Sequence, residues 1–198
     1  MEFRRRQIKS QAQRQRVALI PGSFNPPTNA HRALLEAALH NVDEAVALLP
    51  RAFPHKSYAP VSMEDRIRML EQLSPQPYSI AVSEGGLFLE MCLEFQRDAP
   101  AAEIFVACGR DAAERILTWH YSDPEALDLM FSSFQLMVAA RHGDFHPPTR
   151  FHGRIHTLNL DPEHDAASST EVRERIRKGT EWRHLVPELV APFVERFY

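Results

Sequence analysis

Short apolar runs rich in β-forming residues alternate with segments of helical spacing along this chain. Between the runs, the chain repeats apolar side chains at the three-to-four-residue spacing of an amphipathic helix. Such alternation builds a parallel sheet with helices on both faces, so we expect a doubly wound α/β fold. The expected strands are residues 17–20, 44–49, 78–83, 103–108, 134–140 and 154–160, and the expected helices are residues 30–42, 62–73, 87–95 and 111–119.

The C-terminal part has a different pattern. Residues 168–179 and 186–197 predict two consecutive helices, the first ended by Gly179 and the second opened near Pro187. The sequence contains no internal repeat and no low-complexity linker. We therefore expect residues 17–198 to form a single domain with a C-terminal helical region.

Charge is unevenly distributed over the 198 residues. Residues 1–16 hold six Lys or Arg and one Glu, whereas the whole chain has a net charge of −3. We expect residues 1–16 to be a mobile, solvated extension; a basic arm that binds nucleic acid or an acidic membrane surface is the alternative. The acidic body argues against nucleic acid as the main ligand. Two cysteines without zinc spacing, no secretion signal and no membrane-length apolar run predict a cytoplasmic protein.

Ligands of doubly wound sheets bind beyond the carboxyl ends of the strands. Loops with unusual residues follow four of the expected strands in this sequence. We expect these loops to converge on one edge of the sheet, although they are far apart in the chain. They are residues 21–31, 50–56, 109–111 and 165–173.

The first loop, PGSFNPPTNAH, combines turn residues with a threonine and a histidine. Gly22 permits close backbone approach, and Ser23 and Phe24 offer amide donors. Thr28 and His31 lie three residues apart at a helix start, so both side chains are expected on the same side of the helix. A helix N-terminus with a hydroxyl and an imidazole is suited to phosphate oxygens.

The segment SSTEVRERIR predicts a second helix start of the same kind. Ser168 and Glu171 have the spacing of a capping box, Ser169 and Thr170 add hydroxyls, and Arg173 matches a phosphate with a planar fork of donors. The two helix starts together predict a polyphosphate cradle. Neither segment has the P-loop pattern.

Simpler structural interpretations exist for each piece. A serine-rich helix start is usually only a cap, and a single histidine in a first turn usually lies in the core or on the surface. The histidine spacings do not predict a metal site made of protein ligands. His152 and His156 would lie about 13 Å apart along a strand, too far to share one ion.

Taken together, these motifs resemble the nucleotidylyltransferases with (H/T)-x-x-H and S-S-T-x-x-R signatures, and most of all the nicotinate or nicotinamide mononucleotide adenylyltransferases. The resemblance runs from Val17 to the C-terminus and implies a Rossmann-like sheet. It also implies attack of a mononucleotide 5′-phosphate on the α-phosphorus of ATP, with Mg²⁺ held by phosphates and water. The matching segments are GSFNPPTNAH, PHKSYAPVSMEDRIRML, GRDAAERILTWH, RHG and SSTEVRERIRKG.

The resemblance also implies roles for individual residues. His31 would stabilise the transition state with Arg173 and Lys56 nearby, and Asp111 would accept hydrogen bonds from ribose hydroxyls. Trp119 would stack on the pyridine ring. The implied ATP-binding residues are Gly22, Ser23, Phe24, Thr28, His31, Gly109, Asp111, Ser168, Ser169, Thr170 and Arg173, and the implied mononucleotide-binding residues are Lys56, Phe88, Thr118, Trp119 and Arg141.

One departure leaves the acceptor open. Relatives carry an aromatic-Thr-x-x-Thr segment that touches the pyridine nucleotide, and here Leu89 and Cys92 replace both threonines. A different phosphorylated acceptor, CTP as donor, or a catalytically silent nucleotide-binding protein are the alternatives. The sequence decides neither the acid or amide form of the pyridine nor whether the protein forms a homo-oligomer.

Overall fold

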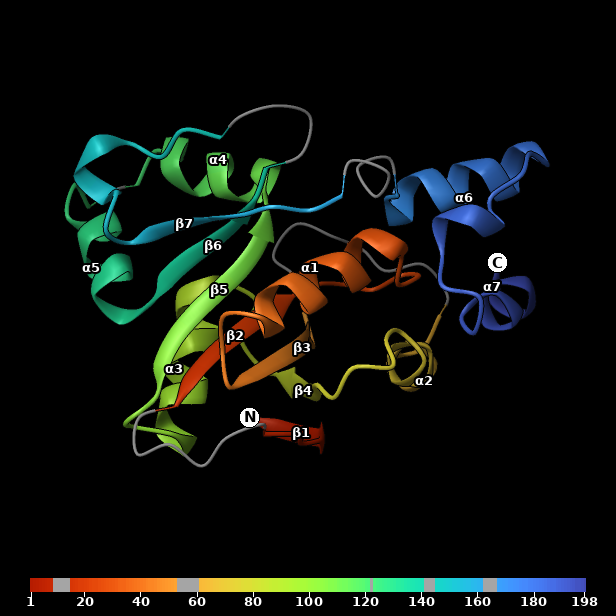
Figure 1. The fold of residues 1–198 in the computed structure, drawn as a ribbon, viewed down its shortest axis with the longest axis horizontal. Coiled ribbons are helices and arrows are strands. Elements are labelled where there is room, and N and C mark those ends of the chain that lie inside the picture. Colours follow the sequence, from red (N-terminus) through yellow and green to blue (C-terminus); the bar gives the residue numbers. More distant parts are fainter. Residues whose placement is uncertain (9–14, 53–60, 122, 141–144, 162–166) are drawn as a thin grey trace.

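The computed structural model describes residues 1–8, 15–52, 61–121, 123–140, 145–161 and 167–198. Within these ranges, seven strands form one sheet in the order β1-β4-β3-β2-β5-β6-β7 (Figure 1). All neighbouring strands are parallel except β1 and β4, which are antiparallel. The strands are β1 (Glu2–Arg5), β2 (Arg16–Pro21), β3 (Glu44–Pro50), β4 (Ser79–Ser83), β5 (Glu103–Gly109), β6 (Gln135–Ala139) and β7 (Ile155–Leu158).

The six parallel strands have the order of a dinucleotide-binding fold. From β2 the chain moves outward through β3 to β4, then crosses back to β5 on the other side of β2 and continues to β6 and β7. The strand order therefore reverses between β2 and β5, and ligands of such sheets bind at this reversal. The predicted doubly wound, Rossmann-like fold is confirmed, and each predicted strand lies within two residues of an observed one.

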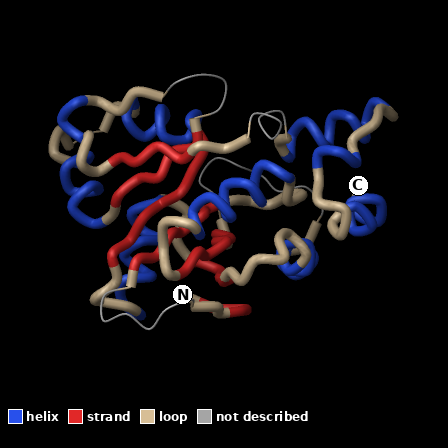
Figure 2. The backbone as a smooth tube through the Cα atoms, in the orientation of Figure 1, coloured by secondary structure: helices blue, strands red, loops and turns tan. Residues whose placement is uncertain are grey.

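Helices cover both faces of the sheet (Figure 2). α1 (Asn29–Leu39) and α2 (Met63–Glu71) bury Leu35 and Ile67 in one cluster with Ala18 and Ile20 of β2. α3 (Phe88–Asp98), α4 (Arg110–Thr118) and α5 (Ala126–Ser133) contribute to a second cluster with alternate residues of β2. Alternate strand residues point to opposite faces, which explains why β2 contributes to both clusters.

The predicted C-terminal helical region is also present. α6 (Ser169–Lys178) and α7 (Ala191–Phe197) pack with the start of α1 and with α2 in a third cluster that contains Ala30, Met69, Val172, Val190 and Val194. Between them lies the short helix η3 (Arg183–Leu185), and η1 (Thr149–Phe151) precedes β7. Pro187 opens a turn that leads into α7 rather than starting the helix itself.

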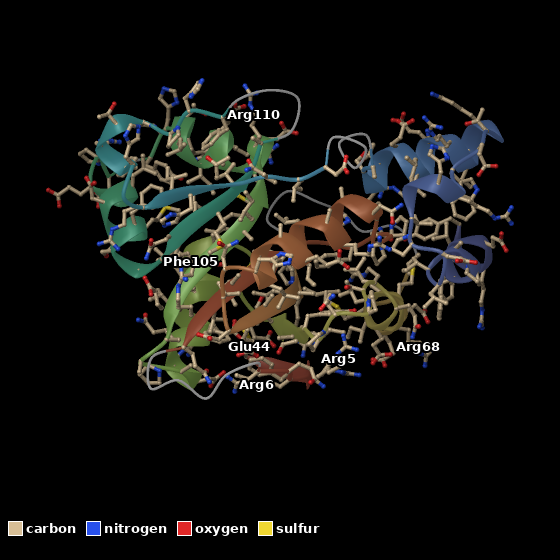
Figure 3. All side chains as sticks on the ribbon, in the orientation of Figure 1. Arg5, Arg6, Glu44, Arg68, Phe105 and Arg110 are labelled. Carbon is tan, nitrogen blue, oxygen red and sulfur yellow. The ribbon has the colours of Figure 1, made fainter. Side chains whose placement is uncertain are left out.

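The N-terminus differs from the mobile extension expected for residues 1–16. Glu2–Arg5 form β1, which pairs with β4 at the edge of the sheet. The Phe3 ring packs edge-on against Phe95, with centroids 6.1 Å apart, and this contact gives the strand an apolar anchor. Arg6 then reaches Glu44 at the base of the sheet (Figure 3).

Among the residues that the structure describes, no helix is long and apolar enough to cross a membrane.

Candidate active site

In the loop from β2 to α1, the Phe24 ring packs directly against Gly22. The Gly22 N–H donates to the carbonyl of Leu48 across 3.0 Å, which continues the pairing of β2 with β3. Phe24 has a φ of 46°, in the left-handed region, and its ring is buried. A Cβ on Gly22 would lie 2.9 Å from Cζ of this ring, so the loop requires glycine here. The Phe24 ring in turn packs against the His31 imidazole, with centroids 5.0 Å apart.

Thr28 and His31 are joined at the start of α1. The Thr28 backbone N–H donates to Nδ1 of His31 across 3.0 Å, and the Thr28 hydroxyl oxygen lies 2.8 Å from the same nitrogen. An N–H can only donate, so Nδ1 is the acceptor and the neutral imidazole carries its proton on Nε2. The Thr28 hydroxyl also lies within donating distance of the Ala167 carbonyl, at 3.0 Å, and the residue has no exposed surface. We therefore interpret Thr28 as a residue that positions His31, in place of the direct phosphate contact expected from the sequence.

The start of α6 is attached to the same loop. The Ser169 hydroxyl donates to the carbonyl of Pro26 across 2.8 Å, and the Arg173 guanidinium donates to the carbonyl of Asn25. Figure 1 shows α6 beginning beside the start of α1. The predicted meeting of two helix starts that are distant in the chain is confirmed. It places His31 on α1 and Arg173 on α6, the two helices whose starts contact this loop.

The remaining predicted residues of α6 belong to the same helix start. The Ser168 hydroxyl accepts the N–H of Glu171 at 3.1 Å and caps the helix, as predicted. The Thr170 hydroxyl accepts a second hydrogen bond from Arg173 at 3.3 Å. A guanidinium has five N–H donors, so Arg173 retains donors for a further anionic group.

Two residues that the sequence reasoning missed, Arg66 and Tyr198, hold this loop in place. The Arg66 guanidinium, which is 4% exposed, donates to the carbonyl of Ser23 at 3.0 Å. The Tyr198 hydroxyl donates to the side-chain oxygen of Asn25, which is also buried. Burial raises the pKa of the Tyr198 phenol, and the nearby charge of Arg173 opposes this effect. The one sequence signal for these residues was Arg66, a charged residue next to Ile67 on the buried side of its helix.

A cavity of about 460 Å³ adjoins the loop on the side of α3, α4 and α5. Ligand pockets for small molecules commonly have this size and a mainly apolar lining. The loop contributes Gly22 and Ser23, so the cavity and the two helix starts share one segment of chain. The other lining residues are Pro21, Gly86, Leu87, Phe88, Leu89, Ala112, Arg115, Ile116, Tyr121, Asp123, Ala126, Leu129 and Met130.

The predicted mononucleotide-binding residues differ in their position relative to the cavity. Phe88 lines the cavity, whereas Thr118 and Trp119 do not belong to its described wall. The Thr118 hydroxyl donates to the carbonyl of Glu114, and the Trp119 side chain is 56% exposed at the end of α4. Tyr121 and the residues of α5 line the cavity instead, and an amphipathic pattern in residues 126–133 was the available signal for them.

Gly109 and Asp111 lie at the reversal of strand order. β2 pairs with β5 so that Leu19 lies beside Val106, and continuing this register brings Gly22 level with Gly109. Asp111 is exposed in the first turn of α4. Lys56 and Arg141, the other two predicted site residues, lie outside the described residues. The described part of the chain contains no group of three His, Cys, Asp or Glu residues that could hold a metal ion.

Comparison with known proteins agrees with this geometry. The family model described as cytidylyltransferase-like matches residues 19–175, which include both helix starts and the cavity. The chain belongs to the cytidylyltransferase-like family. It is therefore an enzyme of the nucleotidyltransferase class, as the sequence predicted.

Similar proteins were found by sequence and by structure. The chain is 27% identical to a probable nicotinate-nucleotide adenylyltransferase of Geobacillus kaustophilus over 91% of this chain and 83% of that protein. A protein of the same name from Neisseria gonorrhoeae is 27% identical over 81% of this chain and 87% of its own length. The nicotinic acid mononucleotide adenylyltransferase of Plasmodium falciparum complexed with NaAD superposes with a TM-score of 0.71 at 16% identity, covering 92% of this chain and 96% of that one. This structural likeness shows the shared fold.

Proposed function

We propose that this protein transfers the adenylyl group of ATP to a pyridine mononucleotide, giving the dinucleotide and pyrophosphate. The observation that carries the proposal is the attachment of both helix starts to one loop that also lines an apolar cavity. One side of the loop offers donors for a polyphosphate, and the other offers a space for a ring. The names of the curated relatives support the same pair of substrates.

The reaction needs alignment and charge stabilisation more than proton transfer. A 5′-phosphate monoester is already ionised near neutral pH, because its second pKa is about 6. Its oxygen attacks the α-phosphorus of ATP, the bond between the α-phosphorus and the bridging oxygen breaks, and pyrophosphate leaves with that oxygen. Negative charge grows on the phosphoryl oxygens during this step, so fixed donors around them lower the barrier.

The residues of the cradle supply such donors. The Nε2–H of His31 would donate to an oxygen of the reacting phosphate, because its Nδ1 is used by Thr28. Arg173 and the first-turn amides of α6 would stabilise the charge on the departing pyrophosphate. A guanidinium has no lone pair to offer a metal ion, and Mg²⁺ prefers oxygen ligands to an imidazole nitrogen. In this proposal Mg²⁺ therefore enters as part of MgATP, held by phosphates and water.

The test offers ATP and Mg²⁺ with each of the two pyridine mononucleotides and follows dinucleotide and pyrophosphate by chromatography. We expect equal amounts of both products, formed at a rate that falls sharply in the His31→Ala variant. CTP in place of ATP tests the donor. Absence of any dinucleotide with either acceptor would contradict the proposal, and ATP binding without turnover would favour a silent nucleotide-binding protein.

A second candidate keeps the chemistry and changes the acceptor. Leu89 lines the cavity where relatives are expected to carry a threonine, and Cys92 is fully buried beside it on α3. A wall without these hydroxyls also suits other phosphorylated compounds with an apolar group. Pyrophosphate release measured with a panel of such acceptors distinguishes the candidates, because the first predicts release with pyridine mononucleotides alone.

A further inference from the structure

The strand β1 begins at the same edge of the sheet as the candidate active site (Figure 1). It is antiparallel to β4, and its first residue, Glu2, pairs with Val82, one residue before β4 ends. Ligands of a doubly wound sheet bind beyond these carboxyl ends. β1 therefore lies beside the start of the loop from β4 to α3, although it precedes residues 19–175, which match the family model.

This loop and the first turn of α3 form one wall of the cavity. The wall residues are consecutive in the chain: Gly86, Leu87, Phe88 and Leu89. At the start of the loop, the Glu84 N–H donates to Oε2 of the buried Glu94 across 3.1 Å. Glu94 lies on α3 itself, so this bond attaches the loop to the helix. The position of α3 consequently sets the position of this wall.

Phe3 joins β1 to α3. Its ring packs edge-on against Phe95, with centroids 6.1 Å apart, and the Arg6 guanidinium lies over the same ring, 4.6 Å from its centroid. Phe95 has no exposed surface and follows Phe88 by seven residues on α3. The two residues therefore share one face of the helix, about 10 Å apart along its axis. Because a helix is a rigid element, a shift at Phe95 is transmitted to the wall at Phe88.

Ion pairs at the same place are weaker candidates for holding β1. Arg51, which follows β3, donates to Glu2 across 2.5 Å and to Glu84 across 2.6 Å. All three side chains are exposed to solvent, and exposed ion pairs contribute little to stability. The contact of Phe3 with a fully buried ring is therefore the stronger attachment of β1 to the helix.

We propose that Phe3 is a positioning residue for the acceptor side of the reaction. By fixing β1 on Phe95, it holds α3 and the preceding loop in the position that shapes the cavity wall. This inference rests on the proposed function, because it takes the cavity as the space for the acceptor's ring. The proposed donors to ATP lie on α1 and α6, so the effect of Phe3 reaches the acceptor and spares ATP.

The kinetic experiment compares the wild type with Phe3→Ala and Phe3→Leu. MgATP and the better mononucleotide are varied in turn, which gives a KM for each substrate. We expect Phe3→Ala to raise the KM of the mononucleotide by about three- to tenfold and to change the KM of ATP by less than about twofold. Phe3→Leu keeps an apolar contact with Phe95, so its KM for the mononucleotide should stay within about twofold of the wild-type value.

Hydrogen exchange tests the wall without turnover. The N–H groups of Glu84, Gly86 and Leu87 donate to carboxylates of α3 in the native protein. The peptide that covers residues 84–89 should exchange at least about threefold faster in Phe3→Ala than in the wild type, because the wall then opens more often. A peptide that covers residues 168–173, at the start of α6, should exchange at the wild-type rate.

Val42→Ala is the matched control for a general loss of stability. Val42 is buried in the cluster beneath α1 and α2, just before β3 begins, so it lies at the end of the sheet opposite the site. This variant also loses apolar contacts. It should nevertheless leave the KM of the mononucleotide and the exchange of residues 84–89 at the wild-type values.

The outcomes separate this inference from the proposed function. An unchanged KM for the mononucleotide in folded Phe3→Ala overturns the role of Phe3, and so does an equal rise in the KM of ATP or in Val42→Ala. Failure of Phe3→Ala to fold also overturns it, because the residue then supports the whole fold. If neither mononucleotide reacts with ATP, the proposed function is wrong, and hydrogen exchange alone decides whether Phe3 holds the wall.

Discussion

The backbone N–H of Thr28 donates to Nδ1 of His31 across 3.0 Å, at the first turn of α1. This bond fixes which imidazole nitrogen carries the proton, because Nδ1 can accept the N–H only with its lone pair. Since the Thr28 hydroxyl also reaches the Ala167 carbonyl, the same residue couples the imidazole to the segment that enters α6. One threonine therefore sets the tautomer of His31 and contributes one of the contacts between the two helix starts.

The first prediction concerns the donor on Nε2. His31→Ala should lower kcat by about 10²–10³-fold, as expected for the loss of one preorganised donor to a developing negative charge. His31→Gln places an amide N–H nearer to the position of Nε2 and should recover part of the loss. His31→Asn places its amide nearer to Nδ1 and should not. The measurement is steady-state turnover with MgATP and the better mononucleotide.

The dissociation constant for ATP provides the control for these three variants. It should change much less than kcat, because the proposed bond strengthens in the transition state. Equal turnover in His31→Ala and wild type would refute the assigned role.

The second prediction separates the two bonds of Thr28. Thr28→Val keeps the shape and the backbone N–H but removes the hydroxyl, which leaves the carbonyl of the buried Ala167 without this donor. The free energy of unfolding should fall by about 1–3 kcal/mol, the cost of an unsatisfied buried acceptor. Thr28→Ser keeps the hydroxyl and should lose less than Thr28→Val. Urea denaturation gives both values, and a loss in Thr28→Ser as large as or larger than the loss in Thr28→Val would show that the hydroxyl is not the main contribution of this side chain.

The sequence predicted the sheet well because its strands are buried on both faces. Residues 44–49 form an apolar run bounded by turn residues, and such runs are typical of central parallel strands. β1 has no such pattern, since Phe3 is its one large apolar residue among charged neighbours. Its place in the sheet depends on β4 and on Phe95, which are distant in the chain, so local reasoning predicted a mobile extension instead.

The site was predictable to a similar extent. Helix starts carry local signals, and the capping serine Ser168 with Glu171 revealed one of them. The support for the β2–α1 loop carries little local signal, because Arg66 and Tyr198 reach it from α2 and from the end of the α7 segment, both distant in the chain. Much of the cavity wall was missed because α3, α4 and α5 assemble it together, and local patterns do not predict how these helices pack.

The third prediction concerns the buried carboxylate of Glu44, the first residue of β3. Glu44 has no exposed surface, and it accepts hydrogen bonds from the Ser79 hydroxyl at 2.5 Å and from Arg6 at 3.3 Å. Arg6→Met removes the cation and should lower the free energy of unfolding by about 1–2 kcal/mol, less than for a fully buried pair because Arg6 is partly exposed. Adding Glu44→Gln should recover part of this loss, because the buried charge is then gone.

Arg4→Met is the matched control in the same extension. Arg4 pairs with Glu2 and Glu64 at the surface, so its loss should cost less than about 0.5 kcal/mol. Chemical denaturation at low and high salt measures all variants. A cost for Arg6→Met no larger than that for Arg4→Met would show that the N-terminal extension does not compensate the Glu44 charge.

The fourth prediction concerns alkaline stability. Burial raises the pKa of the Cys108 thiol from 9.0 to about 12, because the thiolate would lie among the apolar residues of the second hydrophobic cluster. Above pH 9 the unfolded chain releases this proton while the folded protein keeps it. The unfolded state then binds fewer protons, and the linkage relation makes the free energy of unfolding fall as the pH rises toward 12. The contribution of this one thiol approaches about 1.4 kcal/mol per pH unit in that interval.

Cys108→Ala isolates this contribution, since alanine fills the site without a titratable proton. The difference in unfolding free energy between wild type and Cys108→Ala should stay constant from pH 6 to pH 8. Between pH 9 and pH 11 the wild type should lose stability relative to Cys108→Ala. Buried Cys92 remains in both proteins, and its effect cancels in the difference. Rapid reaction of the native thiols with a disulfide reagent at pH 8 would contradict the prediction, because a protonated, buried thiol is unreactive until the protein opens.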